Sequence, residues 1–416
     1  MRGPPRPLHC RGMSSISAPI GVRAPSSSSR FDELVAVTPP TRDRTVDFLR
    51  AFSILVVVLW HWVFSVTHWT AGGTLTMPNP IATVPGLWLA TWVLQIMPLF
   101  FFIGGFANYV AWNANERKRG SVGGFLTARL RRLVTPIAAL IVTWTVIDVT
   151  LRSAMPGYTG VLHWGFVVFV PLWFLGVYGA VVCLAPLTLR LHQRAPGRAL
   201  LGVGLAVATI DVLRFTLRSD VLGFTNGLLV FVFVHQLGYF YGDGTLTRSS
   251  RRVHWAITLG SVGALALLTS LAAYPRSMVA MQGEPISNMF PPTACIAVLG
   301  SFQAGLALLL RPSLNRWLDR PGPWKAVIAA NSVSMTLFTW HMTAYVMAVG
   351  VVDLLGGRLL AHPTAEWWAQ RPLWLFLPGV FLAGLIAVFA RFELASPHRP
   401  ARCAGAALQT AGRRNR

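Results

Sequence analysis

The sequence contains a series of apolar runs about 20 residues long, separated by short polar or basic segments. A helix of about 20 apolar residues crosses the roughly 30 Å hydrocarbon core of a bilayer. The runs lack the period-2 alternation of a membrane β-barrel, so helices are predicted. Charged residues make up 12% of the chain, about half the ~25% that is usual for soluble domains. The predicted fold class is therefore all-α, a polytopic membrane bundle of about ten helices.

The basic residues between the runs predict the orientation of this bundle. With the N-terminus in the cytoplasm, 30 of the 36 lysines and arginines fall in cytoplasmic segments and six in outer ones. This bias follows the positive-inside rule and predicts that both termini are cytoplasmic. The net charge of +22 therefore reflects membrane topology, and no nucleic-acid partner is predicted. The predicted spans lie near 46–68, 86–112, 133–152, 165–188, 199–215, 221–241, 254–273, 293–310, 327–352 and 373–391.

Three regions are predicted along the chain. Residues 1–41, rich in Ser, Pro and Arg, are expected to form a disordered cytoplasmic tail, 42–391 the transmembrane domain, and 392–416 a basic cytoplasmic tail. The first 40 residues contain no apolar segment typical of a signal peptide. Cysteines far apart in the sequence predict no metal site and no disulfide framework. They are Cys10, Cys183, Cys295 and Cys403.

The first apolar run contains ionisable residues, which are costly inside a membrane and therefore indicate function. Arg50 and His61 are eleven residues apart, so both project from one helical face, about 16.5 Å from each other along the axis. An arginine at the cytoplasmic boundary would place His61 near the middle of the membrane. Asp47 lies three residues before Arg50 and can pair with it. His61 could also be a packing histidine that bonds a neighbouring helix.

This segment resembles the first helix of the acyltransferase-3 family, in which Arg-x10-His follows an Asp-Phe-Leu stretch. The resemblance extends over 42–391 and implies an integral membrane O-acyltransferase in the cell membrane, of the stand-alone form without an SGNH domain. Many members have Ser-Gly where this chain has Gly104-Gly105. Further similar stretches are Phe100–Phe106, Arg129-x-x-Arg132 followed by Leu133 and Pro136, Trp173-Phe174-Leu175, and a late helix from Asn331 to His341.

The resemblance implies that an acyl group moves from cytoplasmic acyl-CoA, expected to be acetyl-CoA, to a hydroxyl of a glycan, a lipid-linked sugar or another envelope or secreted molecule. Acyl-CoA acts as co-substrate, and no permanently bound cofactor is predicted. His61 has the residue type of a general base, with an unperturbed pKa of about 6.5; a covalent acyl-histidine stays open. Arg129 and Arg132 lie at i, i+3, and with Arg50 they suit the phosphates of CoA. Plain membrane anchoring would also explain basic residues in this loop.

Four residues are weaker candidates for substrate contact, namely Asp47, Gly105, His235 and His341. Each histidine could line the pocket or bond between helices, and Gly105 could admit the thin pantetheine arm or a neighbouring helix. A secondary transporter or flippase for an envelope precursor is the alternative function, because intramembrane Arg, His and Asp also mark transport pathways. Transporters usually show two matching halves, and this sequence shows no such pairing.

Overall fold

The computed structural model describes residues 42–271 and 274–394. The tail predicted at 1–41 and residues 395–416 of the tail predicted at 392–416, with Cys10 and Cys403, lie outside the described residues, whereas 392–394 belong to the last helix. Ten helical spans in the described residues are long and apolar enough to cross a membrane, which confirms the all-α fold class and the predicted number of spans. The chain is a multi-pass membrane protein. The spans are formed by α2 (Arg44–Val63), α3 (Trp88–Leu94) with α4 (Met97–Arg117), α5 (Val122–Ala154), η2 (Phe166–Phe169) with α7 (Leu172–Arg194), α8 (Pro196–Leu217), α9 (Asp220–Gly242), α11 (Arg251–Leu271), α12 (Ala294–Leu318), α14 (Ser334–Leu354) and α16 (Arg371–Leu394).

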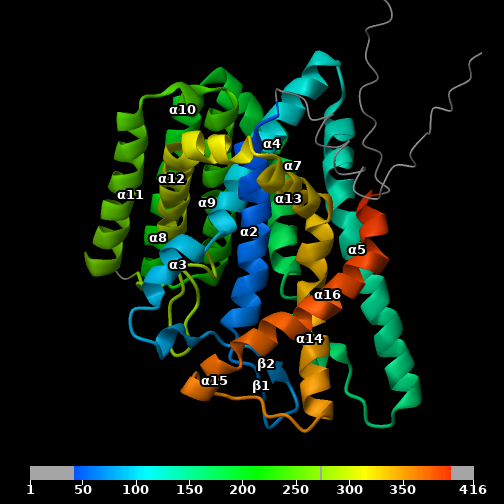
Figure 1. Cartoon of the computed structure of the whole chain (residues 1–416). Helices are drawn as coiled ribbons and strands as arrows, with labels where there is room; N and C mark the ends of the chain where they lie inside the picture. Colours follow the sequence, from blue (N-terminus) through cyan, green and yellow to red (C-terminus); the bar gives the residue numbers. More distant parts are fainter. Residues whose placement is uncertain (1–41, 272–273, 395–416) are drawn as a thin grey trace, which may run out of the picture.

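The described part of the chain begins and ends at the same end of the bundle, as an even number of spans requires (Figure 1). We call this end the basic face, because the connections there hold the arginines that follow α4, α7 and α9. The other end is the outer face. Short elements cover both faces: β1 (His68–Trp69), β2 (Leu75–Thr76), η1 (Pro80–Ala82), α6 (Val161–Trp164), α10 (Thr245–Arg248), α13 (Pro321–Ser332) and α15 (Ala365–Ala369).

The bundle is built around α2, which lies near its middle with α11 and α12 at one edge and α5 at the other (Figure 1). The most extensive helix pairs are α4 with α9, α11 with α12, and α14 with α16. Phe101 of α4 and Phe231 of α9 stack with ring centroids 4.0 Å apart, and both are buried. Helices α5, α8 and α11 bury few of their residues and expose many valines and leucines, as lipid-facing helices do.

Several span boundaries differ from the predicted ones because tertiary and capping contacts set them. Span 86–112 is interrupted between Leu94 and Met97, and Pro98 occupies the first turn of α4, where its missing N–H costs nothing. Helix α5 begins eleven residues before the predicted span, because Ser121 caps it by accepting a hydrogen bond from Gly124 N at 3.0 Å. The ninth span was predicted at 327–352, but residues 327–332 belong to α13 and the membrane helix α14 starts at Ser334.

The loop between α11 and α12 is fastened to the outer end of α8. The hydroxyl of Tyr274 donates to Asp211 Oδ2 at 2.8 Å, and the same oxygen accepts from Ala294 N at 2.7 Å. Burial raises the pKa of the Tyr274 hydroxyl, so the group stays a donor across the physiological range. This anchor fixes the start of α12.

Candidate functional site

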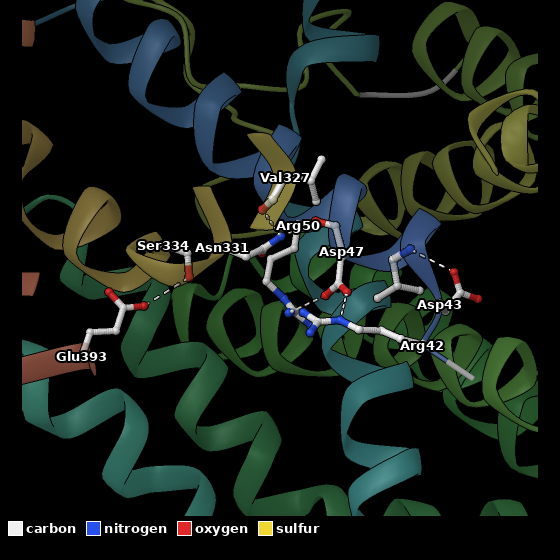
Figure 2. A network of polar contacts seen from close by, with 9 residues as sticks. Arg42, Asp43, Asp47, Arg50, Val327, Asn331, Ser334 and Glu393 are labelled. Atoms are coloured by element: carbon white, nitrogen blue, oxygen red, sulfur yellow. Dashed lines mark hydrogen bonds and ion pairs between the residues drawn. The ribbon is translucent and has the colours of Figure 1, made fainter. Parts of the chain in front are cut away.

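The predicted ion pair on α2 is present at the basic face. Asp47 Oδ1 lies 3.3 Å from Arg50 Nη1, and Asp47 Oδ2 lies 2.5 Å from Arg42 Nε. The carboxylate is thus shared between two guanidinium groups (Figure 2). The backbone oxygen of Asp47 accepts a hydrogen bond from Asn331 Nδ2 at 2.8 Å, which ties α13 to α2. Asp47 therefore orients Arg50 through their ion pair. It is not among the residues that line the neighbouring cavity.

A cavity of about 200 Å³ opens in the half of the bundle nearest the basic face. It brings together the three arginines that the sequence predicted for CoA, from α2 and α5, and adds polar residues from α4, α7, α13 and α16. The lining residues are Arg50, Ile54, Phe100, Ile103, Gly104, Ala107, Asn108, Arg129, Arg132, Leu133, Phe174, Leu175, Tyr178, Val182, Asn331, Ser334, Met335 and Glu393.

The electrostatic character of this cavity is positive. Arg129 donates through Nη2 to the backbone oxygen of Ala107, which leaves its charge without a carboxylate partner among the described residues. Arg132 and the Tyr178 hydroxyl have neither a hydrogen bond nor an ion pair to any described residue. Arg50 shares its one carboxylate with a second arginine. An anion that entered would find guanidinium and hydroxyl donors ready to bind it.

The only carboxylate in the described lining is Glu393, and it is already engaged. Its oxygens accept from Met335 N and from Thr336 N, each at 3.0 Å, and from Thr336 Oγ1 at 3.0 Å. The carboxylate therefore caps the N-terminus of α14, where the helix dipole also favours a negative charge. Figure 2 shows Glu393 reaching Ser334 from α16. The carboxylate accepts the N–H groups of Met335 and Thr336, which a preceding helical turn would otherwise accept. Helix α14 can therefore start as a separate helix after α13.

Three phenylalanines pack together at the cavity, and we call them the aromatic cluster; Phe100 and Phe174 line the cavity, and Phe338 packs against both. The ring centroids of Phe100 and Phe174 are 5.3 Å apart, and Phe338 lies 6.3 Å from the first and 5.3 Å from the second. Phe338 also lies 6.0 Å from the ring of His341. The aromatic cluster therefore connects the cavity lining to His341.

His61 and His341 are in contact next to the aromatic cluster. His61 Nδ1 lies 3.2 Å from His341 Nε2 and 2.9 Å from Val57 O, and His341 Nδ1 lies 2.8 Å from Phe338 O. A carbonyl oxygen only accepts, so both Nδ1 atoms are assigned the proton, and Nε2 of His341 accepts from His61. In this assignment Nε2 of His61 keeps an unprotonated lone pair, and no described residue hydrogen-bonds it.

The span predicted at 46–68 ends earlier in the structure, because α2 ends at Val63 and His61 is in its last turn. The placement of His61 near the middle of the membrane stays a prediction. Thirteen residues of α14 follow His341, about 20 Å of helix, so α2 stops where α14 is still inside the bundle. Buried Arg371 holds this end, with Nη1 3.4 Å from both Val63 O and Ser65 O. Its guanidinium lies 3.7 Å from the centroid of the Trp367 ring. A cation at carbonyls of a helix C-terminus is favourable.

Comparison with known families decides what class of protein carries this site. A family model described as an acyltransferase domain, that of the acyltransferase-3 family, matches residues 43–392. The chain belongs to this family. It is therefore a membrane acyltransferase, as the sequence predicted. No curated protein and no solved structure gives a significant match.

Two further predicted site residues of the acyltransferase, besides Asp47, His61 and His341, lie outside the cavity lining. His235 is buried on α9, and its Nε2 accepts from Asn108 Nδ2 at 3.0 Å, so His235 stands one side chain behind the cavity wall. Gly105 faces the α9 backbone, because a Cβ placed there would lie 1.8 Å from His235 O. The structure thus gives both residues packing contacts between α4 and α9, whereas Gly104 lines the cavity.

The sequence reasoning missed five polar residues around the acyltransferase site. Tyr178 and Asn108 lie in apolar helices, and that setting was a usable signal because intramembrane polar groups are costly. Glu393 falls beyond the end of the last expected span, and Arg371 was assigned to an outer loop. Asn331 lies within the predicted span 327–352 but was noted only in the family resemblance. Within the described residues no group of three His, Cys, Asp or Glu side chains is placed to hold a metal ion.

Proposed function

We propose that this acyltransferase moves an acyl group from acyl-CoA, bound at the basic face, to a hydroxyl group of a carbohydrate or of another envelope or secreted acceptor. The observation that carries the proposal is the convergence of Arg50, Arg129 and Arg132 on one cavity. CoA carries a pyrophosphate and a further phosphate, and arginine forks bind phosphate oxygens in pairs. The only carboxylate of the described lining, Glu393, is occupied by backbone N–H groups, so it leaves the arginine charges largely uncompensated.

The dimensions of the cavity favour a short acyl group such as acetyl. Its volume of about 200 Å³ is below the roughly 300–1,000 Å³ of pockets that enclose drug-sized ligands. In the proposal the cavity takes the slender pantetheine arm, and the nucleotide stays at the mouth with its phosphates near the arginines. In the proposal the rings of the aromatic cluster limit the room for a long acyl chain. Rotation of Phe338 would admit a small acyl group toward the histidines.

The proposed step uses Nε2 of His61 as general base. Nε2 removes the proton of the acceptor hydroxyl while the oxygen attacks the thioester carbonyl carbon. The new C–O ester bond forms, the C–S bond breaks, and the CoA thiolate takes the proton back from His61. His341 accepts from Nδ1 of His61 and so holds the imidazole in the tautomer that exposes Nε2.

The acceptor is proposed to approach from the outer face. His61 is not among the residues that line the donor cavity, it contacts His341, which lies against Phe338, and α2 ends two residues after His61. An acceptor from the outer face would therefore meet the base without passing the phosphate-binding arginines. The resemblance that the sequence showed to enzymes acting on envelope and secreted molecules agrees with this direction.

The proposal can be tested with purified protein in nanodiscs, scoring acyl-CoA binding and CoA release separately. We compare wild type, His61→Gln, the pair Arg129→Ala/Arg132→Ala, and Arg131→Ala as matched control. Arg131 lies in the same turn of α5, is exposed and is not among the lining residues. Binding is measured by titration calorimetry with acetyl-CoA, and turnover by thiol detection with candidate acceptors.

We expect the arginine pair to weaken acetyl-CoA binding at least tenfold and Arg131→Ala to leave it unchanged. His61→Gln should bind acetyl-CoA normally and lose CoA release by about 10²–10⁴-fold, the usual contribution of a general base. If Arg131→Ala weakened acetyl-CoA binding as much as the arginine pair does, Arg129 and Arg132 would contribute only general surface charge and no specific contact. A wild type that binds no acyl-CoA while export of an envelope precursor continues in His61→Gln cells would favour the transporter.

A further inference from the structure

A second concave site lies on the other side of the bundle from the donor cavity. It is an apolar groove of about 500 Å³ between the pair α8 and α9 and the pair α11 and α12. Figure 1 shows α11 and α12 at one edge of the bundle, with α2 between them and α5. Its walls are almost entirely carbon, as the side chains of Phe233, Phe240, Ile257 and Leu308 illustrate. None of its lining residues lines the donor cavity.

The floor of the groove is open space and not a tight helix contact. A Cβ placed on Gly260 of α11 would meet nothing within 4 Å. On the facing helix α12, a Cβ placed on Gly305 would lie 2.5 Å from Thr258 Oγ1, so α11 and α12 touch there. The groove thus runs beside a closed helix contact. Inside a bilayer a cleft of this size between helices must be filled by an apolar occupant, because a void forfeits packing contacts.

The groove lies toward the basic face and ends beneath three arginines. Leu246 of α10 lines it, and α10 joins α9 to α11 at that face (Figure 1). Arg248, Arg251 and Arg252 follow within six residues, all exposed. None of the three forms an ion pair with a described residue; Arg248 donates to Asp243 O at 2.9 Å. The nearest carboxylate of this turn, on Asp243, is engaged by His192 Nε2 at 3.0 Å.

We propose that this groove binds one anionic phospholipid of the leaflet at the basic face. One acyl chain lies along the apolar floor beside Gly260, and the headgroup phosphate contacts Arg248, Arg251 and Arg252. Charge complementarity selects this occupant, because basic clusters at the cytoplasmic ends of membrane helices attract anionic headgroups. A helix of a second copy would fill the apolar floor but would leave the three guanidinium groups without a counter-ion. The site is separate from acyl transfer and does not depend on the proposed donor.

The test is native mass spectrometry of the full chain released from nanodiscs that contain phosphatidylglycerol and phosphatidylcholine in equal amounts. Gly260→Leu fills the floor of the groove without a backbone clash. Gly263→Leu is its matched control, because a Cβ there also meets nothing within 4 Å and Gly263 does not line the groove. A second set replaces Arg248, Arg251 and Arg252 by glutamine, with Arg316→Gln at the same face as control. Thermal unfolding of each variant checks that the fold is kept.

We expect wild type and Gly263→Leu to retain one phosphatidylglycerol per chain, and Gly260→Leu to lose it at least tenfold. Each arginine replaced should reduce the preference for phosphatidylglycerol over phosphatidylcholine about fivefold, whereas Arg316→Gln should leave it unchanged. Equal retention of both lipids, or retention that Gly260→Leu does not change, would overturn the site. A dimer that Gly260→Leu dissociates would show that a second copy occupies the groove and would equally overturn it.

Discussion

Two adjacent glycines on α4 face different neighbours and so separate packing from ligand binding. A Cβ on Gly105 would lie 1.8 Å from His235 O and 3.1 Å from Gly238 Cα, both atoms of the α9 backbone. A Cβ on Gly104 would lie 2.7 Å from Cε2 of the Tyr178 ring, which is a side chain of the cavity wall. We therefore predict that Gly105→Ala damages the fold, whereas Gly104→Ala damages the cavity.

The expected change in the free energy of unfolding depends on whether the atoms that contact the new Cβ can shift. In Gly105→Ala the 1.8 Å approach must open beyond 3.0 Å, and only a separation of α4 from α9 can open it. Overpacking of this kind costs about 1–3 kcal/mol, and a backbone clash belongs at the upper end. Alanine recovers about 1 kcal/mol of helix propensity, so a net loss near 2 kcal/mol is expected. In Gly104→Ala the Tyr178 ring can shift, so the propensity gain roughly cancels the clash, but the ring then narrows the cavity.

The assay is thermal unfolding in detergent together with calorimetric titration of acetyl-CoA. Gly105→Ala should unfold several degrees below wild type, and the fraction that stays folded should bind acetyl-CoA with wild-type affinity. Gly104→Ala should unfold near the wild-type temperature and bind about tenfold more weakly. A Gly105→Ala protein with normal unfolding and weakened binding would refute the reasoning and make Gly105 a ligand contact. Normal affinity in Gly104→Ala would show that this cavity is not the donor site.

Four further changes test individual parts of the site. Phe338→Ala widens the passage, so kcat/KM for butyryl-CoA relative to acetyl-CoA should rise severalfold; an unchanged ratio would mean that this ring does not limit acyl size. His341→Ala removes one of the two acceptors for Nδ1 of His61 and leaves Val57 O. Turnover should fall about 10- to 100-fold with an unchanged Kd for acyl-CoA; a parallel loss of affinity would contradict the positioning role. Arg371→Lys loses the planar guanidinium that donates through Nε to Trp367 O and through Nη1 to Val63 O and Ser65 O. The free energy of unfolding should fall by about 1.5–3 kcal/mol in a denaturant titration; unchanged stability in the lysine variant would show that only the positive charge matters. Glu393→Ala removes the cap of α14 at about 1 kcal/mol, yet it should not weaken acyl-CoA binding by calorimetry, because it also removes a negative charge; weaker binding would oppose the electrostatic account.

The sequence predicted the membrane helices well because their signal is local. Length and apolar composition suffice to locate a span, and the charge bias gives an even number. The ends of the helices were predicted less well because partners distant in sequence set them. Helix α2 stops at Val63 with Arg371 on its last carbonyls, and α14 starts at Ser334 with Glu393 on its first N–H groups. Neither partner has a fixed spacing from the helix end that it caps.

In the candidate site, too, contacts between residues close in sequence could be predicted and contacts between distant residues could not. Helical spacing placed Asp47 next to Arg50, and the ion pair confirms it. Spacing could not reveal that His61 and His341, 280 residues apart, touch each other. Periodicity also could not tell which side of α4 faces the cavity, because Gly104 and Gly105 are consecutive and only the position of α9 distinguishes them.

The aromatic cluster also bears on how the membrane stays sealed. A charge that crosses a membrane potential of 100 mV changes in energy by about 2.3 kcal/mol, so an open route lined by Arg50, Arg129 and Arg132 would leak anions. Under the proposal, the rings of Phe100, Phe174 and Phe338 would keep the polyanionic CoA on one side of the electric field. Under the proposed chemistry the acyl group moves outward and the proton of the acceptor hydroxyl moves to the CoA thiolate through His61, while the C–S electron pair stays on the sulfur, so no net charge crosses. The turnover is then electroneutral, and its rate in proteoliposomes should not respond to an imposed potassium diffusion potential.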